Sequence, residues 1–233
     1  MYDHDFLGRR VMKDVTGTSK KQHKINKHPK KKTPPSVITH FLYDRSGHLL
    51  AEPDAGTGAT GNEYLWLDDM PVALVSAGTL YFVHPDHLGT PQKITDAAQA
   101  IAFDLVLRPF GQAEQQTFPS LTNLRFPGQY FDAEDSLHQN WFRDFDPSIG
   151  RYVESDPIGL KGGINTYGYA RNNPIKFTDP TGQRAFTPCW LVNKITLRTC
   201  PPSTQCDYDC WDGSTYETHV VGFHCPFLDF KYY

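Results

Sequence analysis

The sequence predicts an all-β protein built from antiparallel β-hairpins, and three observations lead to this prediction. Short runs of β-branched and aromatic residues alternate with polar residues, as half-buried strands do. Turn formers and aromatic residues are frequent, with 18 glycines, 18 prolines, 12 tyrosines and 15 phenylalanines among 233 residues. Before residue 183, no segment repeats its apolar residues at the helical period, although a short helical turn fits within 161–172.

The expected hairpins follow one another along the chain. Segments 2–13 and 43–54 share Tyr-Asp, then Gly-Arg or Gly-His, then apolar residues. Each therefore predicts a strand, a tight Asp/Gly turn and a second strand. Residues 63–96 predict four strands at EYLWL, PVALV, TLYFVHP and PQKITD, separated by the turn signals DDMP, SAG and DHLG. The segments AFDLVLRPFGQ and LRFPGQYFD, and the alternating WFRDFDPSIGRYVESDP, continue this pattern.

Charge and cysteine are unevenly distributed along the chain. The net charge is −3 overall, but residues 1–40 carry ten Lys or Arg against three Asp or Glu. Most of these lysines lie in 20–35, which we interpret as a solvated, disordered loop. Binding of nucleic acid or another anionic surface is the alternative, weakened by the absence of interleaved aromatic residues that would stack on bases. All five cysteines lie in the last 45 residues, which indicates two modules.

Membrane insertion and signal-dependent export are not expected. The most apolar run, 70–83, is interrupted by Ser76, Gly78 and Thr79, so it does not predict a transmembrane helix. The N-terminal MYDHDFLGRR has no apolar stretch of the kind found in a secretory signal peptide. Export as a passenger of a larger protein stays open, as does a longer natural N-terminus.

The tetrad Asp-Pro-x-Gly occurs twice, beginning at Asp156 and at Asp179, which are 23 positions apart. Asp, Pro and Gly are the preferred residues at the first, second and fourth positions of a type I turn. A related Asp-Pro turn begins at Asp146, where no chemistry is evident. Sequence physics alone therefore favours two turns over a functional pair.

Several longer segments resemble the Rhs/YD-repeat family, specifically the C-terminal Rhs repeat-associated core of bacterial polymorphic toxins. The resemblance covers about 37–182, and loosely 2–13. The segments that carry it are YDHDFLGRR, FLYDRSGHLLAE, YLWLDDMPVALV, YFVHPDHLGTPQKITD, RFPGQYFDAEDSLHQNWFRDFDPSIGRYVESDPIGL and NTYGYARNNPIKFTDPTG.

This resemblance implies an architecture of three parts. Members of the family build a hollow YD-repeat shell from spiralling β-hairpins, and the core region closes one end of it. We expect residues 1–35 to form a YD-like hairpin with the lysine-rich loop, 36–182 the core, and 183–233 a variable Cys-rich tip. In polymorphic toxins the segment after the core is the toxic payload. A closed shell needs many more hairpins than this chain has, so the chain is expected to be one end of a shell or a remnant.

The resemblance also implies a self-cleavage site. Asp156 and Asp179 would form a carboxylate pair that acts as general acid and general base on one water molecule. Arg151 would lower the pKa of one carboxyl or polarise the scissile carbonyl. The target would be the peptide bond after the second tetrad, between Gln183 and Arg184. Members of the family usually have Leu where this chain has Gln183, which is a departure from the pattern. No cofactor and no metal are expected at this site.

Residues 183–233 leave three interpretations open. Disulfides would suit a small exported domain, although five cysteines leave one thiol over. Zinc is the second interpretation, but the spacing is not typical of a zinc finger; its candidate ligands are Cys206, Cys210, His219, His224 and Cys225. The third interpretation is a variable sequence with reduced thiols.

An enzymatic activity of the tail is not indicated by its sequence. No deaminase signature and no clear nuclease cluster is present, although His219 and His224 lie near acidic residues. Segment 215–230 alternates as a small β unit does.

Three functions remain under consideration. The first is the core plug of an Rhs-type toxin that cleaves itself once to release its tip, with aspartyl autoproteolysis as its only enzymatic step. The second is a non-enzymatic surface or interaction scaffold, or an inert remnant. The third is a small toxin in the tail that acts on nucleic acid.

The expected partners are a longer Rhs shell or secretion machinery, and a cognate immunity protein for the tail. Neither nucleic acid nor a membrane is an expected partner. A bacterial protein is implied, which would leave the cytoplasm by a non-classical route.

Overall fold

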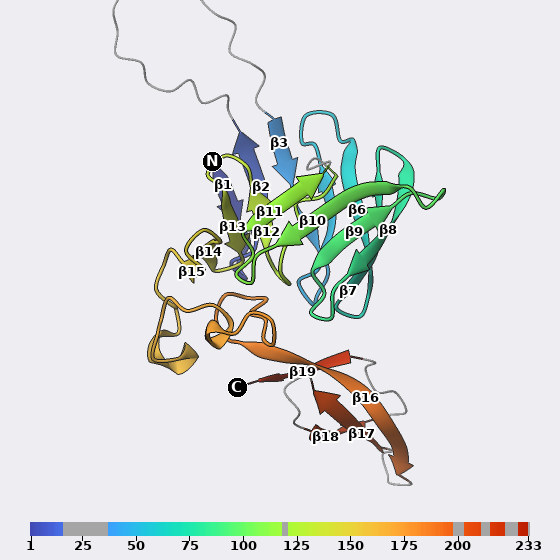
Figure 1. Cartoon of the computed structure of the whole chain (residues 1–233), viewed down its shortest axis with the longest axis vertical. Coiled ribbons are helices and arrows are strands. Elements are labelled where there is room, and N and C mark those ends of the chain that lie inside the picture. Colours follow the sequence, from blue (N-terminus) through green and yellow to red (C-terminus); the bar gives the residue numbers. More distant parts are fainter. Residues whose placement is uncertain (16–36, 118–120, 198–202, 211–214, 222–227, 233) are drawn as a thin grey trace, which may run out of the picture. The chain divides into compact units, whose positions relative to one another are not determined.

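The computed structural model describes residues 1–15, 37–117, 121–197, 203–210, 215–221 and 228–232, with side chains as far as residue 185. The predicted all-β class is confirmed, because the described part of the chain contains antiparallel strands and no α-helix (Figure 1). Its helical elements are two short 3₁₀ turns, η1 (Gly159–Gly162) and η2 (Ala170–Asn172). Nothing helical in these ranges has the length and apolar character that crossing a membrane requires.

The chain divides into two compact units. The first contains residues 1–64 and 75–79, and the second contains 65–74 and 80–233. The first three strands, β1 (Tyr2–His4), β2 (Arg10–Val15) and β3 (Val37–His40), form an antiparallel sheet in chain order. The hairpin predicted for residues 2–13 is confirmed by the pairing of β1 with β2. The lysine-rich segment 20–35 lies outside the described residues.

Eight further strands form one antiparallel sheet in consecutive order. Its eight strands are β4 (Leu42–Tyr43), β5 (Leu49–Pro53), β6 (Thr60–Leu67), β7 (Met70–Ser76), β8 (Thr79–Pro85), β9 (Pro91–Thr95), β10 (Ile101–Leu107) and β11 (Ala113–Thr117). The four strands predicted within 63–96 are all present. A meander of this kind needs a tight turn after every strand.

Several turns share one feature, an aspartate whose carboxylate accepts backbone N–H groups of its own turn. Oδ1 of Asp5 accepts N–H groups from residues 7 and 9, and Oδ1 of Asp86 accepts those of residues 88 and 90, each within 3.0 Å. Asp96 binds residues 98 and 100 in the same way. The carboxylate satisfies donors that the turn leaves free, which explains why Asp recurs at these turns.

A four-stranded antiparallel sheet follows, and the candidate site is built on it. Its strands are β12 (Tyr130–Asp132), β13 (Leu137–Asn140), β14 (Arg143–Asp146) and β15 (Arg151–Tyr152), in chain order. Beside it, Phe126, Phe145, Tyr152 and Tyr169 form a buried aromatic cluster. The rings of Phe145 and Tyr169 have centroids 4.8 Å apart. This cluster anchors β14, β15 and the irregular segment between residues 153 and 185.

The C-terminal residues form a separate four-stranded antiparallel sheet. Its strands are β16 (Phe186–Leu197), β17 (Ser203–Cys210), β18 (Thr215–Val221) and β19 (Leu228–Tyr232), in the spatial order β18-β17-β16-β19. The segment 215–230, where a small β unit was expected, contains β18 and the first residues of β19. They lie at opposite edges of the sheet, because β19 pairs with β16 while β18 pairs with β17.

Candidate functional site

Both Asp-Pro-x-Gly tetrads form turns. The N–H of Gly159 donates to the carbonyl oxygen of Asp156 at 2.9 Å, and the N–H of Gly182 donates to that of Asp179 at 3.3 Å. Gly182 has φ +71°, and a Cβ there would lie 2.7 Å from the carbonyl oxygen of Asn140, so no other residue fits easily. The turn hypothesis and the functional hypothesis are therefore compatible, because the turns determine where each aspartate side chain points.

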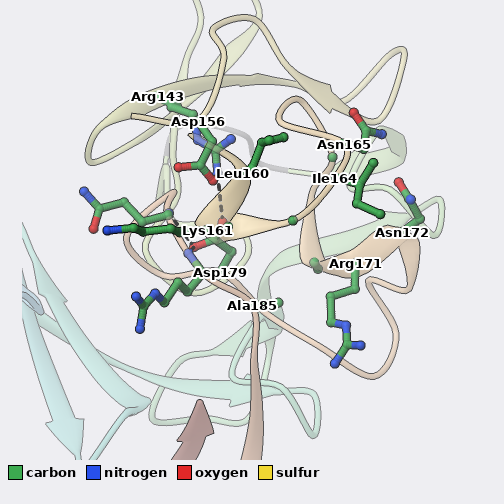
Figure 2. A pocket seen from close by; sticks show the side chains of 16 residues that line it. Arg143, Asp156, Leu160, Lys161, Ile164, Asn165, Arg171, Asn172, Asp179 and Ala185 are labelled. Carbon is green, nitrogen blue, oxygen red and sulfur yellow. Dashed lines mark hydrogen bonds and ion pairs between the residues drawn. The ribbon is translucent and has the colours of Figure 1, made fainter. Parts of the chain in front are cut away.

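Arg143 of β14 joins the two aspartates. Its Nη2 lies 3.2 Å from Oδ2 of Asp156 and 3.2 Å from Oδ2 of Asp179. All three side chains are almost completely buried, with 1% of Arg143, 5% of Asp156 and 3% of Asp179 exposed. Figure 2 shows the guanidinium beside both carboxylates. Two buried carboxylates this close repel each other, and the shared cation is what makes the arrangement stable.

The guanidinium of Arg143 is held by further contacts. Its Nε donates to the carbonyl oxygen of Gly182, and its Nη1 donates to that of Thr166 at 3.0 Å. Its carbon atom Cζ lies 3.5 Å from the centre of the Tyr152 ring. The planar fork of an arginine suits several fixed partners at once. The position of this cation is therefore set by the second tetrad, by the segment after η1 and by the aromatic cluster.

Asp179 accepts four hydrogen bonds at its carboxylate. Oδ2 accepts from the Tyr152 hydroxyl at 2.9 Å and from Arg143. Oδ1 accepts the backbone N–H groups of Gln183 at 2.9 Å and of Arg184 at 3.0 Å. Burial nevertheless outweighs these contacts and raises the pKa of Asp179 to about 6. This carboxyl therefore gains a proton close to neutral pH, and it does so beside the nitrogen of the predicted scissile bond.

Asp156 lies near the carbonyl oxygen of the same peptide bond. An added Cβ at Gly162 would overlap Oδ2 of Asp156, and it would lie 2.9 Å from the carbonyl oxygen of Gln183. These two oxygen atoms therefore border one small volume in front of Gly162. The peptide bond between Gln183 and Arg184 has its nitrogen next to Asp179 and its carbonyl oxygen next to Gly162 and Asp156.

A pocket of about 550 Å³ opens onto this arrangement (Figure 2). It is lined by the three charged side chains, by η1 and the loop after it, by η2, and by residues 183–185. The side chains of Leu160 and Ile164 are 77% and 98% exposed. The peptide bond between Gln183 and Arg184 is therefore reachable from solvent through this pocket, while the carboxylates behind it are buried.

The structure places Arg151 elsewhere. This residue is exposed on β15, where it pairs with Asp146, and it is not among the residues that line the pocket. The arginine that contacts the carboxylates is Arg143. Strand alternation could have identified it, because Arg143 and the fully buried Phe145 are two residues apart on β14 and share a face. An arginine on a buried face requires anionic or carbonyl partners.

Two further residues support the site and were not predicted. Asn140 donates from Nδ2 to the Tyr152 hydroxyl at 2.7 Å and to the carbonyl oxygen of Asp179 at 2.9 Å. Tyr152 in turn donates to Asp179, so the three form a buried chain of hydrogen bonds. The turn at Asp146 shares one bond with the first tetrad, because its Oδ1 accepts the N–H of Ser148 as Oδ1 of Asp156 accepts that of Ile158. It differs in that its Oδ1 also binds the Ser148 hydroxyl, at an exposed position.

The described residues contain no group of three or more side chains suited to hold a metal ion. At the site itself, the guanidinium of Arg143 already occupies the position between the carboxylates where a cation would bind. The chemistry that this arrangement supports is proton transfer on both sides of one peptide bond. The tail residues named as zinc candidates have no described side chains, and His224 and Cys225 lie outside the described residues.

Comparison with known proteins identifies the relatives of this chain. No family model matches it. It is 31% identical over 206 residues to double-stranded DNA deaminase toxin A of Burkholderia cenocepacia (strain H111), which covers 78% of this chain and 14% of that protein. It is 38% identical over 104 residues to the probable deoxyribonuclease RhsA of Dickeya dadantii (strain 3937), covering 43% of this chain and 7% of the relative. The chain belongs to the Rhs-type polymorphic toxins. It corresponds to a C-terminal region of such a toxin and spans less than a sixth of these relatives.

A solved structure supports the fold. The chain matches the Tc holotoxin pore of Photorhabdus luminescens with a TM-score of 0.57 at 21% sequence identity, covering 79% of this chain and 9% of the matched one. At this identity the likeness concerns the fold alone. The all-β architecture of this Rhs-type chain is therefore one that a large toxin assembly also uses.

Proposed function

We propose that this chain is the C-terminal core of an Rhs-type toxin and that it cuts its own backbone once, between Gln183 and Arg184. The observation that carries the proposal is the contact of both aspartates with a single guanidinium nitrogen, at 3.2 Å each. The same aspartates flank the peptide bond that follows the second tetrad. The reaction is hydrolysis of a peptide bond within the chain, so its substrate is already bound.

Each carboxyl has a distinct part in the reaction. Asp156, ionised, accepts a proton from a water molecule that attacks the carbonyl carbon of Gln183. Asp179, protonated, donates its proton to the nitrogen of Arg184 as the carbon–nitrogen bond breaks. The products are a carboxyl group on Gln183 and an amino group on Arg184, and the proton that Asp156 gained returns to Asp179 or to solvent. The hydrogen bond from the Arg184 N–H to Asp179 already orients the leaving nitrogen.

The environment supports this division of roles. The raised pKa of Asp179, about 6, supplies the protonated acid near neutral pH. Arg143 lies 3.2 Å from each carboxylate, so it offsets the negative charge that remains on Asp156. Because Arg143 also binds the carbonyl oxygen of Gly182, it fixes the backbone directly before the scissile bond. Preorganisation of this kind is where most of the rate of such a reaction comes from.

Gln183 is compatible with the proposal, although the family pattern described above has Leu there. The contacts that hold this residue at the site come from its backbone, through the N–H bound to Asp179 and the carbonyl oxygen in front of Gly162. A mechanism that acts on backbone atoms tolerates a change of side chain. We therefore propose cleavage after Gln183.

The biological role follows from the position of the bond. Cleavage would separate the four-stranded C-terminal sheet from the rest of the chain. In this proposal the preceding residues belong to a longer Rhs shell, which leaves a bacterial cell with its secretion machinery. The tail is then the variable tip that is released, and a cognate immunity protein would bind it in the producing cell.

A set of variants tests this proposal. The full-length chain and its variants are made by cell-free synthesis, and the fraction cleaved is followed by intact mass. Asp156→Asn and Asp179→Asn should remain whole, and Arg143→Lys should cleave far more slowly, because lysine cannot bind both carboxylates and the Gly182 carbonyl in one plane. Arg151→Lys is the matched control and should cleave as the natural chain does. Loss of cleavage in Arg151→Lys with retention in Arg143→Lys would refute the assignment.

A further inference from the structure

The register of the C-terminal sheet brings two cysteines together. In the antiparallel pair of β16 and β17, the partner of Cys189 is Cys210. Directly opposite residues in such a pair have Cα atoms about 4.5–5.5 Å apart. That interval lies within the range of about 4.4–6.8 Å that disulfides require between Cα atoms. The backbone therefore places these two cysteines at a spacing that a disulfide can bridge without rearrangement.

The same register excludes other pairings among the cysteines of the described strands. Cys206 lies opposite Lys194 on one side and opposite Thr218 on the other. It is four residues from Cys210 along the same strand, which is about 13 Å in extended chain. Cys189 and Cys210 are therefore the cysteines of these strands that face each other across a pair.

The register also argues against the zinc interpretation of this segment. Residues directly opposite in a pair share a face of the sheet, and successive residues alternate between faces. Cys206 is opposite Thr218, whereas His219 is opposite Gln205. Cys206 and Cys210 consequently lie on one face of the sheet and His219 on the other. A single metal ion would not be reached by all three.

We propose that Cys189 and Cys210 form a disulfide that links β16 to β17. The two thiols together lose two electrons and two protons, and a disulfide-containing oxidant such as oxidised glutathione is reduced to two thiols. One cysteine first forms a mixed disulfide with the oxidant, and the other cysteine then attacks that bond and releases the second thiol of the oxidant.

The disulfide forms in an oxidising compartment, and both cysteines stay reduced in a reducing cytosol. It gives a sheet of about 50 residues the covalent link that domains of this size usually need. This inference does not depend on self-cleavage.

Peptide mapping of the full chain tests the proposal. The protein is incubated with oxidised or reduced glutathione, its free thiols are alkylated, and it is digested with trypsin and an endoproteinase that cuts before Asp. Cys189 is then carried by peptide 185–194 and Cys210 by 209–211, and neither contains a second cysteine. The proposal predicts a cross-linked pair of these peptides in the oxidised sample, which disappears on reduction.

Two variants complete the experiment. Cys206→Ser is the matched control and should retain the link between 185–194 and 209–211. Cys210→Ser should abolish it and leave Cys189 open to alkylation. Complete alkylation of both cysteines after oxidation would overturn the proposal, and so would a link from Cys189 to any other cysteine or to a second chain. In the natural chain alone, peptides 185–194 and 209–211 are either cross-linked or alkylated after oxidation. The test therefore holds even where a variant fails to fold.

Discussion

Replacement of Gly162 by alanine is the most informative single change at the site. Gly162 does not have a left-handed φ, so alanine adds no backbone strain of its own. Its Cβ would overlap Oδ2 of Asp156 and would lie 2.9 Å from the carbonyl oxygen of Gln183, whereas ordinary contact begins at 3.4 Å. The Asp156 carboxylate must therefore move about 1 Å away from Gly162, and a displacement of this size in a reacting group costs about 100-fold in rate.

The assay follows the cleaved fraction over time after cell-free synthesis, in the natural chain and in Gly162→Ala. Gly159→Ala is the matched control on the same turn. It is the more strained substitution, because Gly159 has φ +61°, but its Cβ meets nothing within 4 Å. We expect Gly159→Ala to cleave at the natural rate and Gly162→Ala to cleave slowly. Equal rates in the natural chain and Gly162→Ala would refute the placement of the reacting groups, as would equal inhibition of both variants.

Three further predictions concern the acid and the scissile residue. The pKa of Asp179 is raised to about 6, and its protonated form is the reactive one in the proposed mechanism. Cleavage should therefore accelerate as the pH falls through 6, and a rate that rises with pH would contradict this assignment. From the protonated fraction alone, the rate at pH 5 should exceed that at pH 8 by roughly 100-fold. Tyr152→Phe removes a hydrogen bond that lowers the pKa of Asp179, so the midpoint of the pH–rate profile should move upward. The same change should cost about 1 kcal/mol in the free energy of unfolding, measured in urea, because Asn140 loses an acceptor. Gln183→Leu should cleave at the natural rate, and a marked acceleration would show that the side chain is recognised.

The hairpins could be predicted because their causes are local. An aspartate that binds the N–H groups two and four residues later determines its own turn, and Asp5, Asp86 and Asp96 all do so. Alternating apolar residues then define the strands on either side. The same local reasoning correctly indicated that both Asp-Pro-x-Gly tetrads are turns.

The arginine of the site could not be chosen by proximity in the sequence. Arg151 is five residues from Asp156, but its neighbour Tyr152 faces the core, so strand alternation leaves Arg151 exposed. Arg143 is 36 residues from Asp179 and reaches it only because β14 and the second tetrad pack on the same aromatic cluster. Contacts over such separations depend on the closed fold.

The C-terminal sheet illustrates the same limit. β18 and β19 are consecutive in the sequence, and a local reading would pair them as a hairpin. The sheet instead places β17 and β16 between them. Strand type was predictable from alternation, but the order of strands was not, because it depends on which edges remain available after β16 and β17 have paired.

The measurement that tests the central claim most directly is the intact mass of the full-length chain beside its Asp179→Asn variant. We expect two fragments from the natural chain, the second beginning at Arg184, and one unbroken mass from the variant. Cleavage in water enriched in ¹⁸O should place the label in the new carboxyl group of Gln183. An unbroken natural chain would contradict the account, and so would a break at the same bond that persists in Asp179→Asn.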